Sequence, residues 1–315
     1  MPESTPSYPQ FMQNSHDDGS SAALRVFFMF LCMWEIMYHV AKFGLKICLK
    51  QYPRQIMDSS LFNGENKKNS NGLTNSSSNG RTRSPLDDAK HTLLQRGPSY
   101  VVSFLHSIYV TGRGIMHLYH LWNATNYDKL LIPGMGVLNS YRWAHLEVAR
   151  TNTLFLSYLI YDLFHILLQY PKLGGVDTIL HHLLFASCSV INGTYGLLVF
   201  PFGWLIVGEG STIFLNIRWF LLKSGRGNSA LLDKTNGLFA STFFMTRIGI
   251  YSAGVIHLFY NSLPELRSLP AKTGVPIPLL GLTCGCMLLG WALNIVWGYK
   301  ILAMVTGKTN GKKQQ

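Results

Sequence analysis

Long apolar blocks, separated by polar and mostly basic loops, constrain this 315-residue chain more than any other feature of its sequence. A helix needs about 20 predominantly apolar residues to cross roughly 30 Å of hydrocarbon. Such stretches run near Ala23–Leu49, Ser99–Trp122, Asn152–Tyr170, Asp177–Val199, Phe202–Leu222, Gly237–Tyr260 and Pro276–Val305. We therefore expect an all-α polytopic membrane protein with about seven transmembrane helices. The first stretch contains the ionisable residues Glu35, His39 and Lys42. The alternative that it lies in the membrane interface therefore stays open.

The composition agrees with this class. Hydrophobic residues make up 48% of the chain and charged residues 13%, about half the charged share of soluble domains. Lys and Arg outnumber Asp and Glu by 27 to 15, and because this excess collects in the loops it indicates membrane topology rather than a nucleic-acid partner. The cysteines all lie in or beside apolar blocks, so we expect no disulfide framework, no metal site and no cofactor. They are Cys32, Cys48, Cys188, Cys284 and Cys286.

The basic loops also predict the orientation, because cytosolic loops are enriched in Lys and Arg. The linker after the first stretch is the most basic loop, and its Ser/Asn/Gly-rich centre, Asn69–Gly80, is expected to be disordered. This orientation places the N-terminus in the lumen and the C-terminus in the cytosol. The expected parts are a lumenal polar tail (1–22), a first transmembrane helix (23–49), a cytosolic basic linker (50–98), a six-helix domain (99–305) and a cytosolic tail (306–315).

The chain ends in Lys312-Lys313-Gln314-Gln315. Two lysines at these places before a cytosolic C-terminus form a dilysine signal, an address read by retrograde coat proteins rather than an anchor. The signal predicts a multi-pass protein of the endoplasmic reticulum membrane; the alternative is a basic flank of the last span. The glycosylation sequon Asn123-Ala-Thr125 falls on the predicted lumenal side, and its use stays open because it abuts a helix end.

Polar side chains inside the predicted spans are the main functional signal. An ionisable group at the bilayer centre costs at least about 2.5 kcal/mol and usually faces a water-filled or ligand-lined interior. Those in the second span recur at helical spacings and form one stripe. In chain order the residues are His106, Arg113, His117, His120, Asp162, His165, Asp177, His181, His182, Glu209, Asn216, Arg218, Arg247 and Asn294. They are enough to surround a central cavity, although His120, Asp177 and Arg218 lie near span ends and are expected at the headgroup level.

Several chemistries are excluded by this set. A metal-dependent lipid desaturase or hydroxylase needs several clustered histidine ligands, whereas the adjacent His181 and His182 point about 100° apart on a helix. The sequence has no Gly-x-Ser-x-Gly nucleophile elbow and no Gly-rich phosphate loop. Histidine acid–base chemistry and a lipid pocket with polar groups around a head group both remain.

Short motifs occur in a characteristic order over the last six spans. They are Ser103-Phe-Leu-His106, Ser157-Tyr-Leu-Ile-Tyr-Asp162, His181-His182, Glu209, Asn216-Ile-Arg218-Trp219-Phe220, Thr246-Arg247-Ile248, Asn294-Ile-Val-Trp297 and Lys300. With this ordered set, the region from about Ser99 to Lys300 resembles the TLC-domain family, which includes ceramide synthases and several non-synthase relatives. The resemblance implies a TLC-type bundle of six helices around a polar-lined cavity.

One departure from the synthase pattern is informative. Ceramide synthases carry a His-Asp pair downstream of the double histidine, where this sequence has Glu209-Gly210. The chain is therefore similar to the non-synthase TLC-domain branch, whose members are linked to membrane lipid composition and homeostasis.

Three hypotheses follow. The first is a lipid-binding or lipid-regulating membrane protein of the endoplasmic reticulum. The second is an N-acyltransferase of the ceramide synthase type, in which His182 deprotonates a sphingoid base or carries the acyl group from acyl-CoA and Glu209 replaces the missing acid. The third is a seven-helix receptor. Against it, this sequence lacks the Asp-Arg-Tyr and Asn-Pro-x-x-Tyr switch motifs expected of such receptors. We favour the first; whether the protein is an enzyme stays open.

These hypotheses assign the candidate site residues. The catalytic candidates are His181, His182 and Glu209. The candidates for binding a membrane lipid, such as ceramide, a sphingoid base or a fatty acyl-CoA, are Arg113, His117, Asp162, Asn216, Arg247 and Asn294.

Overall fold

The fold is taken from a computed structural model, which describes residues 11–51, 85–131 and 140–305. Within these ranges all regular elements are helices, and a bridge between Leu131 and Leu197 joins two loops. In chain order the helices are α1 (Phe11–Gln51), α4 (Pro85–Leu121), α5 (Asn126–Leu130), α6 (Arg142–Leu168), α7 (Val176–Tyr195), α8 (Val199–Val207), α9 (Gly210–Lys223), α10 (Ala230–Phe243), η1 (Phe244–Ile250), α11 (Tyr251–Ile256), η2 (His257–Asn261), α12 (Leu263–Thr273) and α13 (Ile277–Val305). The expected all-α membrane class is confirmed.

Five described stretches are long and apolar enough to cross a membrane. They are Ser21–Lys50, Arg142–Leu168, Val199–Lys223, Ala230–Asn261 and Ile277–Ala303. Helices α4 and α7 occupy the other two predicted spans, and the count of seven stays a prediction. The linker centre and the dilysine signal lie outside the described residues.

Several helices extend beyond the predicted spans. Helix α1 begins at Phe11, so the second half of the expected polar tail is helical. Helix α6 begins at Arg142 rather than near Asn152, which places Glu147, expected in a loop, on the helix. Hydropathy marks the apolar part of a helix, whereas the backbone hydrogen bonds that define it continue through polar residues.

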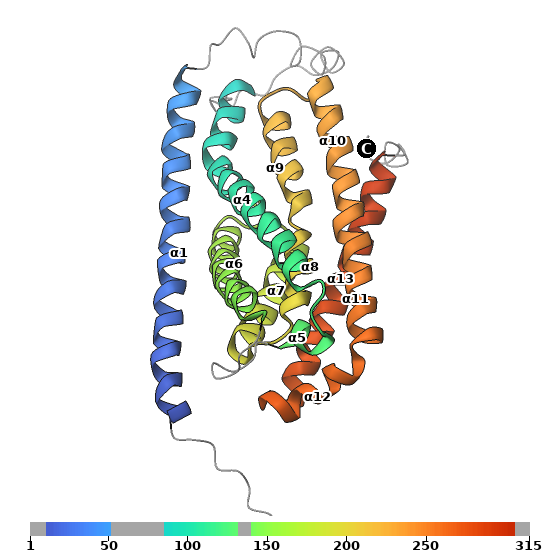
Figure 1. The fold of residues 1–315 in the computed structure, drawn as a ribbon. Coiled ribbons are helices and arrows are strands. Elements are labelled where there is room, and N and C mark those ends of the chain that lie inside the picture. The colour runs from blue at the N-terminus through green and yellow to red at the C-terminus, as the bar shows by residue number, and fades with distance from the viewer. Residues whose placement is uncertain (1–10, 52–84, 132–139, 306–315) are drawn as a thin grey trace, which may run out of the picture.

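The helices pack as a bundle in which neighbouring segments alternate in direction (Figure 1). The C-terminal ends of α1 and α13, the N-terminal end of α4 and the α9–α10 loop lie at one end, drawn at the top. The short helices α5 and α12 lie at the opposite end. This alternation is the relative arrangement that the predicted topology requires; which end faces the cytosol stays a prediction.

Helix α1 is attached to the bundle by polar as well as apolar contacts. The Trp34 indole Nε1–H donates to Ser157 Oγ on α6 at 3.0 Å. Glu35 Oε2 lies 3.0 Å from Nε2 of His165, also on α6, and its other oxygen lies 3.3 Å from Nε2 of His39. The carboxylate in the first apolar block therefore has partners within the bundle.

The centre of the bundle is helix α8, whose residues Val199–Val207 are all buried. Glycines let the neighbouring helices approach it closely. A Cβ atom at Gly114 of α4 would lie 2.8 Å from side-chain atoms of Ile206 and Val207. A Cβ at Gly254 of α11 would lie 2.4 Å from the Trp204 ring.

Two predicted spans are interrupted close to this core. The fifth consists of α8 and α9, which are joined at Gly208-Glu209. The sixth contains the π-helical segments η1 and η2, and η1 carries Arg247. Such π-helical turns are rare and occur frequently at functional sites. Both interruptions position side chains of the site described next.

Candidate functional site

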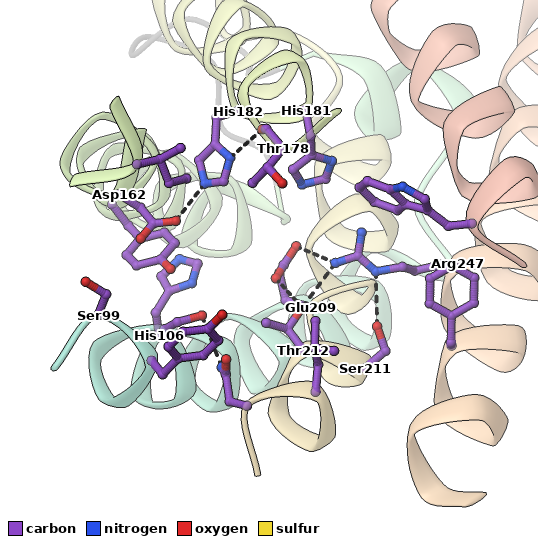
Figure 2. Close-up of a pocket in the computed structure, with 18 of the residues that line it drawn as sticks. Ser99, His106, Asp162, Thr178, His181, His182, Glu209, Ser211, Thr212 and Arg247 are labelled. Carbon is purple, nitrogen blue, oxygen red and sulfur yellow. Dashed lines mark hydrogen bonds and ion pairs between the residues drawn. The ribbon is translucent and has the colours of Figure 1, made fainter. Parts of the chain in front are cut away.

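A cavity of about 440 Å³ lies between α4, α6, α7, α9, the α10–η1 segment and α13; we call it the polar cavity. It occupies the half of the bundle next to the α6–α7 and α9–α10 loops, since Leu173 of the former loop and Ile301 near the end of α13 line it. Its volume falls within the usual range for small-molecule sites, about 300–1,000 Å³. Figure 2 shows how side chains from several helices converge on it.

The walls of the polar cavity are mostly hydrocarbon. Phe155 and Leu159 of α6, Leu215 of α9, and Phe239 and Phe243 of α10 contribute apolar surface. A pocket with this lining favours an alkyl or acyl chain, because burying apolar surface is favourable by roughly 25 cal/mol per Å².

A carboxylate–histidine pair lies at one side of the cavity. His182 Nε2 is 2.9 Å from Asp162 Oδ2, and its Nδ1 is 2.9 Å from the backbone oxygen of Thr178, one turn earlier on α7 (Figure 2). Both ring nitrogens thus face oxygen acceptors, whereas a neutral imidazole has a single N–H. Histidine donates from both ring nitrogens only as the imidazolium, and the Asp162 carboxylate at Nε2 can offset that charge.

A second pair lies opposite, where α8 meets α9. Arg247 Nη2 donates to Glu209 Oε1 at 2.9 Å, and the Thr212 hydroxyl donates to Glu209 Oε2 at 2.9 Å (Figure 2). Arg247 Nε donates to the Gly208 backbone oxygen and the Ser211 hydroxyl, each at 3.0 Å. At the break between α8 and α9 this carbonyl also accepts from the Ser211 hydroxyl at 3.1 Å, and the π-helical segment η1 carries the arginine that binds it. The side chains of Arg247 and Glu209 are 9% and 16% exposed, so the ion pair is largely withdrawn from solvent.

The other histidines of the cavity are held by aromatic rings. His106 of α4 stacks on Tyr158 with centroids 3.5 Å apart and meets Trp34 of α1 edge-on at 5.7 Å. Its ring nitrogens are buried and have no hydrogen-bond partner among the described residues. His181 packs against Phe185 and Trp297, with centroids 4.6 and 5.5 Å apart. The adjacent histidines of α7 therefore diverge, His182 toward Asp162 and His181 toward α13.

Basic residues lie at the end of the cavity nearest the α9–α10 loop. Lys300 of α13 is exposed and lines the cavity there. Arg218 of α9 also lines it, and its Nε donates to Asn236 Oδ1 of α10 at 2.8 Å. Within the described part of the chain, no three His, Cys, Asp or Glu side chains converge as a metal site would require.

The architecture and this residue set agree with one known domain. The family profile described as the TLC domain matches residues 98–303. The chain belongs to the TLC-domain family. The matched region begins one residue before Ser99 and contains the polar cavity in full.

Three similar proteins carry TLC-domain names. TLC domain-containing protein 4-B of Danio rerio is 30% identical over 68% of this chain and 77% of its own length. TLC domain-containing protein 4 of Homo sapiens is 30% identical over 64% of this chain and 71% of its own length. TLC domain-containing protein 4 of Xenopus tropicalis is 27% identical over 69% of this chain and 79% of its own length. The resemblance to the non-synthase branch of the TLC-domain family is thereby confirmed.

The TLC domain gathers most of the predicted site residues. The catalytic candidates His181, His182 and Glu209 all line the polar cavity. So do three of the lipid-binding candidates, namely Asp162, Asn216 and Arg247. Asn294 lines a much smaller space beside it, together with His181, Glu209 and Arg247. Their roles stay predictions.

Two candidates lie elsewhere. Arg113 and His117 of α4 do not line the polar cavity. Arg113 forms an ion pair with Glu147 and donates to the hydroxyl of Thr151 at 3.3 Å, and His117 Nε2 lies 3.0 Å from the same hydroxyl. The predicted polar stripe on α4 therefore does face the interior, but below His106 it contacts α6 directly instead of a cavity.

Other lining residues were not among the predicted site residues. Thr212 has no formal charge and stands outside the motifs, so neither signal finds it. Tyr158, Trp297 and Lys300 belong to the family motifs, and His106 belongs both to a motif and to the polar stripe of the second span, so these signals could have found them.

Proposed function

We propose that this TLC-domain membrane protein binds a lipid in its polar cavity and acts in membrane lipid homeostasis. The observation that carries the proposal is the combination of apolar walls with two internally neutralised pairs, Asp162–His182 and Glu209–Arg247. Apolar walls favour a hydrocarbon chain, and the paired polar groups can donate to and accept from a head group. The relatives' names state only the domain, so they add no ligand.

The proposal includes the endoplasmic reticulum membrane as location. Its support is the dilysine sequence at the C-terminus, read by retrograde coat proteins when the tail is cytosolic. With Lys312 and Lys313 replaced by serine, we expect the protein to spread to the Golgi in fluorescence imaging. An unchanged distribution would contradict the retrieval signal.

The alternative function is N-acyl transfer from a fatty acyl-CoA to a sphingoid base. The observation that favours it is that His182 and Glu209, two groups able to move protons, line the same cavity. His182 would act as the base through Nε2 once the proton there has passed to Asp162 Oδ2, while the Thr178 carbonyl orients the ring through Nδ1. Glu209 is less suited to act as the acid, because Arg247 and Thr212 already bind its two oxygens.

A cavity-filling substitution tests lipid binding directly. Leu215→Trp introduces an indole into the polar cavity, so we expect the lipid that co-purifies in mild detergent to fall about tenfold, equivalent to about 1.4 kcal/mol. The measurement is lipid extraction followed by mass spectrometry, normalised to protein.

The matched control is Leu222→Trp on the same helix. Leu215 and Leu222 are both 39% exposed, but Leu222 does not line the cavity. Equal lipid content in both variants would count against the polar cavity as the binding site.

A further inference from the structure

A second cavity, of about 460 Å³, lies on the other side of α4 and α9; we call it the outer groove. No residue lines both cavities. The apolar residues of the outer groove are Leu45 of α1, Leu93, Val101 and Phe104 of α4, and Ile217, Phe220 and Leu221 of α9. Ser224 and Arg226 complete it.

Helices α4 and α9 form the wall between the two cavities. On α4, Ser103 lines the polar cavity and the next residue, Phe104, lines the outer groove. On α9 the same change of side occurs between Asn216 and Ile217. Successive residues of a helix point about 100° apart, so each helix presents a polar surface to one cavity and an apolar surface to the other.

Two residues that line the outer groove, Leu45 and Phe220, lie close to Gly97 of α4. A Cβ atom there would lie 2.8 Å from Leu45 Cδ1 and 3.6 Å from Phe220 Cε1. Helices α1, α4 and α9 therefore meet at this glycine. From Ile217 to Ser224 the lining follows α9 for roughly 10 Å, at 1.5 Å per residue.

The polar end of the groove carries the positive charge of Arg226. Arg226 lies in the α9–α10 loop and is exposed. None of the ion pairs formed among the described residues includes it, whereas Arg113 and Arg247 are each paired with a glutamate. The Ser224 hydroxyl beside it donates to the Leu221 backbone oxygen. Among the described residues that line it, the groove thus combines a hydrocarbon lining with one cation, Arg226, at one end.

We propose that the outer groove binds one acyl chain of an anionic amphiphile, whose carboxylate or phosphate is held by Arg226. The apolar side chains bury the chain, and the guanidinium donates charge-assisted hydrogen bonds to the anion. A neutral amphiphile would fill the same groove without neutralising Arg226. This site is separate from the polar cavity and does not depend on the function proposed for that cavity.

Photocrosslinking tests the proposal. The probe is a palmitate analogue with a diazirine in its chain and a terminal alkyne, added to the full-length protein in phosphatidylcholine nanodiscs. We expect crosslinks on the α1, α4 and α9 peptides that contain the lining residues. Excess palmitate or lysophosphatidate should compete, and hexadecanol should compete about tenfold more weakly. Competition by palmitate alone would identify a carboxylate ligand, and competition by lysophosphatidate alone a phosphate ligand.

Two substitutions distinguish binding of the acyl chain from recognition of the anionic head group. Ile217→Trp fills the groove and should reduce labelling about tenfold. Arg226→Gln should reduce labelling to a similar extent, since the probe carries the same carboxylate, and because Arg226 is exposed this variant is expected to fold normally. Lys223→Gln is the control, since Lys223 is exposed near the same loop but does not line the groove. Leu215→Trp, in the polar cavity, should retain labelling.

Three results would overturn the proposal. Equal competition by hexadecanol would show that the anion is not recognised. Labelling unaffected by Ile217→Trp, or crosslinks confined to other peptides, would place the probe outside the groove. If labelling fell equally in Arg226→Gln and Lys223→Gln, the loss would come from general surface charge and not from a contact with Arg226.

Discussion

Replacing Arg247 with methionine is expected to destabilise the protein by about 3–5 kcal/mol, because it leaves the buried carboxylate of Glu209 without its cation. Arg247 also donates to the Gly208 carbonyl and the Ser211 hydroxyl, so the same change removes two further hydrogen bonds at the break between α8 and α9. The measurement is unfolding in dodecyl maltoside micelles titrated with SDS.

A second variant shows whether the uncompensated charge causes the loss. Glu209→Gln in the Arg247→Met background removes the buried charge, so we expect it to recover a large part of the lost stability. Arg267→Met is the matched control, because Arg267 of α12 is exposed and its replacement should change stability by less than about 0.5 kcal/mol. If Arg247→Met behaved like Arg267→Met, the ion pair would have no structural role.

The second large effect is expected at His182. His182→Ala leaves the Asp162 carboxylate without its ring partner, costing about 1–3 kcal/mol for a buried group without its partner. If the pair holds a lipid head group, stability and co-purifying lipid should fall together. Adding Asp162→Asn should restore stability because the second substitution removes the buried charge, while lipid binding should stay weak.

The same variants distinguish the acyltransferase. The assay supplies purified protein with a long-chain acyl-CoA and sphinganine. We expect no product from the unmodified protein. Product that disappears in His182→Ala, at unchanged stability and lipid content, would overturn lipid binding as the primary function and assign His182 as the catalytic base.

Much of the fold follows from the one-dimensional pattern. The apolar blocks predicted the membrane class, because about 20 apolar residues in succession have few alternatives to crossing a bilayer. The cost of polar groups in lipid predicted that residues such as His182, Glu209 and Arg247 face the interior, and all three line the polar cavity. Helix ends were predicted less well: Arg142, the first residue of α6, lies in a segment whose sequence reads as a loop.

The sequence by itself determined that this is a polytopic membrane protein with polar groups inside it, since both follow from the apolar blocks and the cost of polar groups in lipid. The order of its motifs gave the resemblance to the TLC-domain family. Only the tertiary structure decided which of these charged side chains form ion pairs with one another. Arg113 pairs with Glu147 and Arg247 with Glu209, a choice that depends on how far each helix is rotated and shifted against its neighbour. Helical periodicity specifies which residues share a face, but it leaves that rotation and shift undetermined. Close contacts such as those of Gly114 in α4 and Gly254 in α11 with α8 restrict both, because packed side chains in a bundle fit at only a few registers.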